Sequence, residues 1–245
     1  MIGAFKRNRG SSQSFAKECQ PSTLKANLEV AKELPFSDRR DFEDATQGYI
    51  GSLSDEQIIG PDGGVVWCMK SYGFLEPETP ANTVNPSLWR QAQLNAIHGL
   101  FKITDNVYQV RGLDISNMTI IEGNTSLIII DTLFTTETAQ ESLKLYYRHR
   151  PQKPVRTVIY THSHSDHYGG VKGIVKEADV KSGEVQIIAP VGFMESVVAE
   201  NILAGNAMHR RSQYQFGMLL SPSVKGHVDC GIGKAASHGT VTLIA

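Results

Sequence analysis

The sequence is poor in cysteine, in net charge and in long apolar runs. Its three cysteines, Cys19, Cys68 and Cys230, lie far apart among 245 residues and lack the close spacing of a zinc knuckle or a redox pair, so we expect free thiols. A formal net charge of −1 provides no overall field for gathering nucleic acid, and we expect no nucleic-acid partner. Any anionic substrate must therefore be held by local groups.

Segments that target or anchor a protein are also absent from the pattern. No stretch approaches the about 18 apolar residues of a transmembrane helix, and the basic start MIGAFKRNRG is not followed by the apolar run of a secretory signal. We therefore expect no membrane span and a cytoplasmic location. A periplasmic or secreted location stays open if the natural N-terminus differs.

The first part of the chain is predicted to lie outside the main domain. Residues 1–35 predict a peripheral arm with an amphipathic helix at 24–34, which Pro35 ends. Residues 36–100 predict a segment that packs on the domain that follows it. Its expected elements are a short helix, a turn at Pro61–Gly64, a strand at 65–67 and a helix from Leu88 that Gly99 can stop.

Residues 101–245 change to strands that alternate with helices. Three β-branched runs, VYQVRG, ISNMTIIEG and SLIIIDT, precede a helix at 135–149 and the buried strand VRTVIY. The short connections predict one sheet that contains residues 107–111, 116–121, 127–131 and 155–160. A helix from about Val171, a strand at VQIIAP and helices through Ala204 and Met218 complete an α/β sandwich.

The chain ends in an apolar run, GTVTLIA, that is typical of a β-strand. Complete domains seldom end within a strand, so this pattern predicts a fragment of a longer protein. We expect the unpaired strand to leave an apolar edge that favours aggregation.

The segment that carries chemistry is THSHSDHYGG, directly after the strand VRTVIY. Alternate side chains of an extended segment point the same way, so His162 and His164 can reach one cation, while Asp166 and His167, past the bend, can reach a second. Imidazole and carboxylate donors without a thiolate favour zinc, with manganese or iron as alternatives. Gly169–Gly170 is expected to start the next helix near the site. A solvated polar loop is the alternative, but this motif rarely arises by chance.

The motif resembles the metal loop of the metallo-β-lactamase superfamily. The segments TVNPSLWRQAQLNAIHGLF, VYQVRGLDISNMTIIEGN, IIIDTLFTTETA, APVGFMESVVAENILAGNAM and RRSQYQFGMLL resemble linear alkylsulfatases, the detergent-degrading branch of that superfamily. The resemblance runs from about Phe36 to the end of the chain. One departure is Cys68, where the branch has an aspartate after the strand at 65–67.

This resemblance implies a metallo-β-lactamase-type αββα sandwich at 101–245, incomplete at the C-terminus. It implies two Zn²⁺ ions, one bound by His162 and His164 and the other by Asp166 and His167, with Asp166 also the catalytic residue. Family members add further ligands, a dimerising helical region and a lipid-carrier-like domain, so the full-length form is expected to be a homodimer. The implied reaction is hydrolysis of an alkyl sulfate ester, such as dodecyl sulfate, to an alcohol and sulfate.

The chain alone is expected to lack a complete dinuclear site and to be inactive. Two zinc ions need about six to eight ligand positions, whereas the motif supplies the four residues already named. The remaining candidates are scattered and lack a strand-to-loop setting: His209, His227, Asp229 and His238.

Several other groups have both a functional and a structural interpretation. His227 in GHVDCG could be a further ligand, although the alkylsulfatase branch does not use this position. Arg210 and Arg211 could steer a sulfate, but two arginines on a helix usually form a solvated face. His98, His149 and His209 need no function. Five apolar residues could line a tunnel for an alkyl chain, but we expect them to belong to the ordinary hydrophobic core: Trp67, Met69, Tyr72, Phe74 and Leu75.

Two alternative functions stay open. One is another hydrolase of the same fold that acts on a thioester, lactone, β-lactam or phosphodiester, and the segment NPSLWRQ argues against it. The other is an inactive remnant that binds metal.

Overall fold

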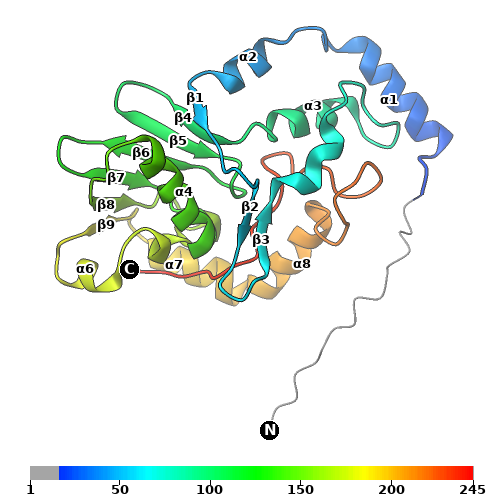
Figure 1. Cartoon of the computed structure of the whole chain (residues 1–245). Coiled ribbons are helices and arrows are strands. Elements are labelled where there is room, and N and C mark those ends of the chain that lie inside the picture. The colour runs from blue at the N-terminus through cyan, green and yellow to red at the C-terminus, as the bar shows by residue number, and fades with distance from the viewer. Residues whose placement is uncertain (1–16, 245) are drawn as a thin grey trace.

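The larger sheet has seven strands of mixed direction and lies on the left in Figure 1. The computed structural model describes residues 17–244. Neighbouring strands are antiparallel up to β7, whereas β7, β8 and β9 are parallel. The prediction of one sheet for the four strand segments is confirmed, with small shifts at their ends. In sheet order the strands are β1 (Tyr49–Gly51), β4 (Gly99–Lys102), β5 (Val107–Arg111), β6 (Met118–Glu122), β7 (Leu127–Ile130), β8 (Val155–Ile159) and β9 (Gln186–Ile188).

Helix α4 (Thr136–His149) connects the parallel strands β7 and β8 and lies across the sheet (Figure 1). Thr135 caps the helix, because its side chain accepts a hydrogen bond from the amide of Thr138. Alternate residues of β5 and β6 are buried, as expected for strands with one covered face. Tyr146 of α4 meets Tyr108 of β5 edge to face at 5.5 Å, which ties the helix to the sheet.

Glu122 at the end of β6 binds the end of α4 and the connection from α4 to β8. Its carboxylate accepts hydrogen bonds from Tyr146 Oη at 2.7 Å, Arg150 Nε at 3.0 Å and Lys153 Nζ at 2.9 Å. The side chain of Glu122 is 9% exposed. These contacts fix the turn between α4 and β8, and β8 leads directly to the predicted metal loop.

A second, two-stranded sheet consists of β2 (Gln57–Ile59) and β3 (Val65–Cys68), joined at the predicted turn. The 3₁₀ helix η1 (Met69–Leu75) and α3 (Pro86–Leu94) follow. The core interpretation of this segment is confirmed, since Phe74 packs against the core and the other members are buried: Trp67, Met69, Tyr72 and Leu75.

Gly99 has a role other than the predicted one. Helix α3 ends earlier, at Leu94, and Asn95 follows as its cap. Gly99 has a φ of 132° and begins β4. A Cβ at this position would lie 2.4 Å from the carbonyl oxygen of Gly51, so glycine allows β1 and β4 to approach closely.

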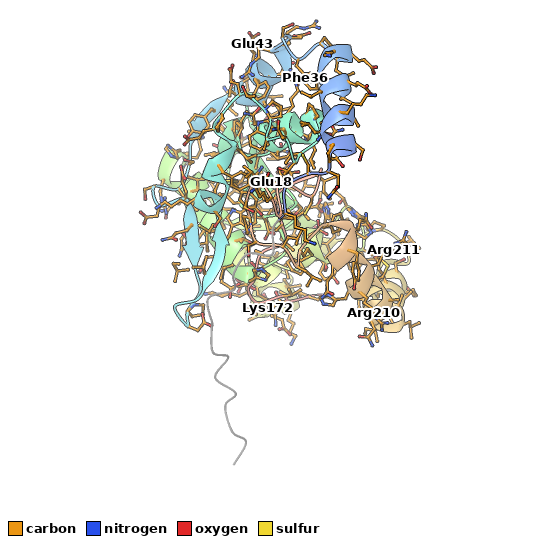
Figure 2. The ribbon with its side chains drawn as sticks, turned by 90° about the vertical axis from the view of Figure 1, so that its right-hand side faces the viewer. Glu18, Phe36, Glu43, Lys172, Arg210 and Arg211 are labelled. Carbon is orange, nitrogen blue, oxygen red and sulfur yellow. The ribbon has the colours of Figure 1, made fainter. Side chains whose placement is uncertain are left out.

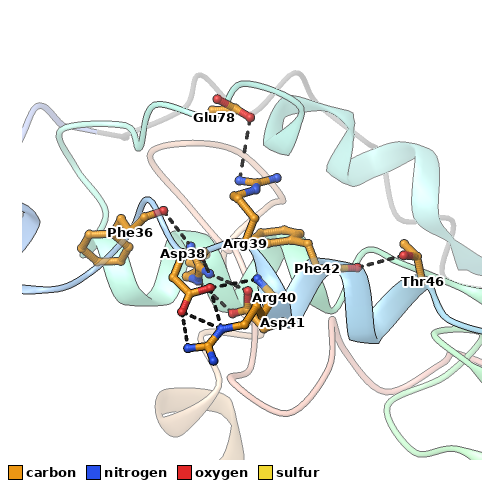
Figure 3. A network of polar contacts seen from close by, with 9 residues as sticks. Phe36, Asp38, Arg39, Arg40, Asp41, Phe42, Thr46 and Glu78 are labelled. Carbon is orange, nitrogen blue, oxygen red and sulfur yellow. Dashed lines mark hydrogen bonds and ion pairs between the residues drawn. The ribbon is translucent and has the colours of Figure 1, made fainter.

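The N-terminal helices α1 (Pro21–Glu33) and α2 (Arg40–Thr46) lie on the outside of the molecule (Figure 1). Arg90 of α3 holds the connection between them, because it donates to Asp41 Oδ2 at 2.9 Å and to the carbonyl oxygen of Phe36 at 3.0 Å. Figure 3 shows Phe36 and Asp41 in this connection. β1 comes from the same part of the chain and pairs with β4 of the large sheet. The domain boundaries near residues 35 and 100 stay predictions.

Short helices follow β8 and β9. The helix expected from about Val171 is only a 3₁₀ turn, η2, with α6 starting at Glu177. The helices expected through Ala204 and Met218 are present as α7, η3 and α8, but α8 ends at Gln215, before Met218. Figure 2 shows Arg210 and Arg211 on α8 at the edge of the molecule. Within residues 17–244, no helix has the length and apolar character needed to cross a bilayer. The bounds are α5 (Ser165–Tyr168), η2 (Val171–Gly173), α6 (Glu177–Lys181), α7 (Phe193–Val198), η3 (Ala199–Leu203) and α8 (Gly205–Gln215).

The last described residues do not form a strand, which corrects the prediction for GTVTLIA. The carbonyl oxygen of Thr240 accepts from the amide of Thr136 at 2.8 Å, and the amide of Thr242 donates to the carbonyl oxygen of Gly169 at 2.7 Å. Backbone groups at the start of α4 and at the end of the metal loop therefore provide hydrogen-bond partners for Thr240 and Thr242. Ile244 is buried, whereas Val241 is exposed, so the apolar side chains of this segment are only partly covered.

Candidate metal centre

The predicted metal loop begins at the carboxyl end of β8, between the parallel strands β7 and β9. His162 and His164 lie in irregular chain, whereas Asp166 and His167 lie in the single helical turn α5. A loop throughout was expected, so this half of the prediction is corrected. Gly169–Gly170 follows this turn and directly precedes the 3₁₀ turn η2, for which Gly170 is the cap residue.

The glycine pair is required where two backbones approach closely. A Cβ at Gly169 would lie 2.2 Å from the carbonyl oxygen of Phe134, and a Cβ at Gly170 would lie 2.1 Å from that of Thr132. The amide of Thr132 also donates to the carbonyl oxygen of His167 at 2.8 Å. The loop is thus clamped onto the segment that follows β7.

Asp131, directly after β7, is the group around which the loop is arranged, and it was not among the predicted site residues. Its Oδ1 accepts from the amide of Thr161 at 2.9 Å, and its Oδ2 accepts from Thr161 Oγ1 at 2.8 Å and from His167 Nδ1 at 2.7 Å. Its φ of 59° is a left-handed conformation that aspartate tolerates better than most residues and that is typical of functional sites. The available signal was the run IIIDT, which puts a carboxylate at the end of a neighbouring buried strand.

The three imidazole rings of the motif are crowded together. The ring centroid of His162 lies 4.6 Å from that of His164 and 4.0 Å from that of His167. Burial lowers the pKa of His162, and the other two rings lower it further. Burial opposes a charge on His167 as well, but its hydrogen bonds with Asp131 and Asp166 outweigh it and raise the pKa of His167 to about 9. His162 is therefore a neutral nitrogen donor at pH 7.

The carboxylate of the motif is ionised. Burial opposes the charge on Asp166, but the neighbouring His167 outweighs it and holds the pKa of this carboxyl below its usual range. Its backbone carbonyl accepts a hydrogen bond from Ser116 Oγ, so the segment before β6 supports the turn.

A second carboxylate that the sequence did not indicate reaches the loop from η3. Glu200 Oε1 lies 3.0 Å from His164 Nε2, and its Oε2 lies 3.5 Å from Ser163 Oγ. Glu200 is far from the motif along the chain and follows no strand, so no local pattern pointed to it.

The donor types fit a divalent cation, although the side chains are paired with one another. Crowded imidazoles, of which that of His162 is neutral at pH 7, form with the ionised carboxylate of Asp166 a borderline-soft donor set that zinc accepts. Within residues 17–244, however, no group of three or more histidine, cysteine, aspartate or glutamate side chains is arranged to hold a metal ion. His167 Nε2 lies 3.3 Å from Asp166 Oδ2. The two residues expected to bind one cation therefore contact each other through the atoms that would bind it.

The structure does not bring His227 to the loop. Its Nδ1 lies 3.0 Å from Tyr72 Oη and its Nε2 lies 3.6 Å from Cys230 Sγ. These groups adjoin a fully buried ion pair in which Lys234 Nζ and Asp229 Oδ2 are 3.0 Å apart. Both ring nitrogens of His227 therefore have partners in a separate buried cluster.

The candidates on α8 also lie apart from the contacts of the loop. His209 lies on α8, exposed and paired with Gln213, while Arg210 and Arg211 are exposed on the same helix (Figure 2). A cavity of about 520 Å³ is lined by the N-terminal segment and α3, so it does not open on the loop. The expectation of free thiols is confirmed for Cys19, Cys68 and Cys230.

Comparison with known proteins places this geometry in a family. Residues 111–243, more than half of the chain, match the family model of the Metallo-beta-lactamase superfamily. The chain belongs to this superfamily. The matched region starts in β5 and includes the loop, Asp131 and Glu200, and the predicted fold class is confirmed.

Similar proteins narrow the comparison to one branch. A linear primary-alkylsulfatase from Pseudomonas sp. is 54% identical over 230 residues, which are 94% of this chain and 34% of that protein. An (R)-specific secondary-alkylsulfatase from Pseudomonas sp. is 53% identical over 231 residues, which are 94% and 35% of the two chains. The solved structure of a stereoselective inverting sec-alkylsulfatase from Pseudomonas sp. has a TM-score of 0.89 at 52% identity, over 94% of this chain and 36% of that one. The predicted resemblance is confirmed, and the chain spans about a third of these relatives.

Proposed function

We propose that this chain is the metal-loop part of a zinc-dependent alkylsulfatase, an enzyme that hydrolyses alkyl sulfate esters such as dodecyl sulfate to an alcohol and sulfate. The observation that carries the proposal is the loop at 162–167, held against Asp131 at the carboxyl edge of β8. The 54% identity to a linear primary-alkylsulfatase supports the substrate class.

In this proposal His162 and His164 bind one zinc ion, and Asp166 and His167 bind the second. A bound zinc ion supplies Lewis acidity, which lowers the pKa of a water molecule to about 7 and attracts the anionic sulfate group. Asp131 keeps the proton on Nδ1 of His167, so Nε2 is the nitrogen that would bind a cation after it loses its proton and its 3.3 Å contact with Asp166 Oδ2. Asp166 is an ionised carboxylate at neutral pH, so it can bind a cation or, as the proposed catalytic residue, accept a proton.

Thr161 extends this control to His162. Its hydroxyl donates to Asp131 Oδ2 at 2.8 Å, so its oxygen is left to accept from His162 Nδ1, which lies 2.9 Å away. Nε2 of His162 is then free to bind metal. One buried carboxylate therefore orients two of the three proposed imidazole ligands.

The remaining parts of the proposal concern the longer protein. Further ligands and a homodimer are expectations from the resemblance, a cytoplasmic location is expected from the N-terminal sequence, and inactivity of the 245 residues alone is expected from the number of ligands. The exposed positions of Arg210 and Arg211 do not favour a role for them in binding sulfate.

The test compares the 245-residue chain with a polypeptide of the relatives' full length. Both are dialysed with zinc, and metal per chain and sulfate release from dodecyl sulfate are measured together. We expect sulfate release by the long form and none by the short one. A long form that leaves dodecyl sulfate intact but hydrolyses a thioester, lactone, β-lactam or phosphodiester overturns the substrate class, and a long form that binds zinc without any turnover supports the inactive remnant. Robust turnover by the short form with two bound zinc ions overturns the prediction that its metal site is incomplete.

A further inference from the structure

Glu200 reaches the metal loop from an irregular turn of helix. The π-helical turn η3 (Ala199–Leu203) lies between α7 and α8, and π-helical insertions occur frequently at functional sites. Asn201 of this turn donates to the carbonyl oxygen of Val197 at 3.0 Å and to Tyr168 Oη at 3.4 Å. The turn is thereby tied both to α7 and to α5, which carries half of the motif.

The carboxylate of Glu200 is directed at the loop rather than at solvent. Its side chain is 26% exposed, although the residues that follow it in η3 are exposed. The 3.0 Å contact of its Oε1 with His164 Nε2 is a normal hydrogen-bond distance. No lysine or arginine pairs with Glu200 among the ion pairs of residues 17–244, so the histidine is the partner that the geometry provides.

The hydrogen-bond chemistry determines which nitrogen of His164 carries the proton. A neutral imidazole has one N–H donor and one acceptor nitrogen, and an ionised carboxylate can only accept. The nitrogen that faces Glu200, Nε2, must therefore carry the hydrogen. The other nitrogen, Nδ1, then has no hydrogen, and its lone pair is free to bind a metal ion. Nδ1 of His162 faces Thr161 and Nδ1 of His167 faces Asp131, so in these two rings Nε2 is the nitrogen left for a metal, once the 3.3 Å contact of His167 Nε2 with Asp166 is broken.

We infer that Glu200 is a positioning residue that fixes the tautomer of His164, so that this ring binds metal through Nδ1 while the other two rings of the motif bind through Nε2. The inference rests on the proposed metal function of the loop. Glu200 then acts on His164 as Asp131 acts on His167. Outer carboxylates of this kind orient the ring and raise its basicity, and losing one typically weakens metal binding about 10–100-fold.

The first test reads the tautomer without any metal. Nitrogen-15 NMR of the histidine side chains of the 245-residue chain at alkaline pH distinguishes Nδ1–H from Nε2–H. We expect the Nε2–H form of His164 in the unaltered chain and in Glu200→Gln, whose amide oxygen still accepts, and a mixture of tautomers in Glu200→Ala. Glu195→Ala, on the exposed face of the preceding helix α7, is the matched control and should leave the signals unchanged. A predominant Nδ1–H form, or no change in Glu200→Ala, overturns the inference.

The second test reads zinc binding. Titration of the same four proteins should give a dissociation constant about 10–100-fold higher for Glu200→Ala than for Glu195→Ala, with the same number of zinc ions per chain. Glu200→Gln should lie between the two. Equal affinities overturn the inference, and loss of one zinc ion in Glu200→Ala also does so, because Glu200 would then be a ligand itself. If neither the unaltered 245-residue chain nor the full-length form binds zinc, the proposed metal function fails, while the NMR result still decides how Glu200 acts on His164.

Discussion

Replacing Glu122 with glutamine is expected to lower the free energy of unfolding by about 2 kcal/mol at pH 7. The hydrogen bond from Arg150, supported by Lys153 and Tyr146, outweighs burial and lowers the pKa of Glu122 from 4.5 to about 2. At about 1.4 kcal/mol for each pH unit, this difference corresponds to about 3 kcal/mol. The side chains of Arg150 and Lys153 are 36% and 21% exposed, so solvent screening reduces the expected effect to about 2 kcal/mol.

The effect of this replacement on the free energy of unfolding should decrease as the pH falls. The pKa of Glu122 is lower in the folded protein than in the unfolded chain, so its stabilisation is complete above the unfolded value of 4.5 and is lost as the pH falls through about 2. Urea unfolding followed by circular dichroism at several pH values between 7 and 2 measures this loss. We expect the unaltered protein and Glu122→Gln to differ most at pH 7 and to converge at the acid end.

Glu177→Gln is the matched control. Lys181 and Lys172 lower the pKa of Glu177 to about 2 as well, but its side chain is 43% exposed on α6. Because solvent screens exposed pairs, we expect a smaller loss that high salt removes. Equal losses for the two variants, or the same pH profile for Glu122→Gln and the unaltered protein, would refute the reasoning from burial.

Three further outcomes are expected. In the full-length form, His164→Ala should abolish sulfate release and leave the circular dichroism unchanged, because it removes a proposed ligand and no core packing; near-normal turnover with full zinc occupancy contradicts this. Asp131→Asn should raise the dissociation constant for zinc about 10–100-fold, measured by titration, because the charged partner of His167 is lost; an unchanged constant contradicts it. Affinity should rise with alkyl chain length, since each buried methylene contributes about 0.8 kcal/mol; equal Michaelis constants for hexyl and dodecyl sulfate below micelle formation count against an alkyl pocket.

The strands were predictable because their side chains alternate or form β-branched runs that local rules recognise. β5, β6, β7 and β8 lie where the runs VYQVRG, ISNMTIIEG, SLIIIDT and VRTVIY indicated. The segment GTVTLIA has the same local character but forms no strand up to Ile244. Its backbone finds partners at Thr136 and Gly169 instead, and these are contacts over long sequence distances that no local rule contains.

The sequence by itself determined the proposed ligands, because His162, His164, Asp166 and His167 are near neighbours in the chain and their order alone suffices to recognise them. Only the tertiary structure decided which groups orient them. Asp131 reaches the loop because β7 and β8 are parallel neighbours, and Glu200 reaches it because η3 packs against the loop from a distant part of the chain. A hydrogen bond needs its partners within about 3 Å of each other, and folding sets that distance independently of separation in the sequence.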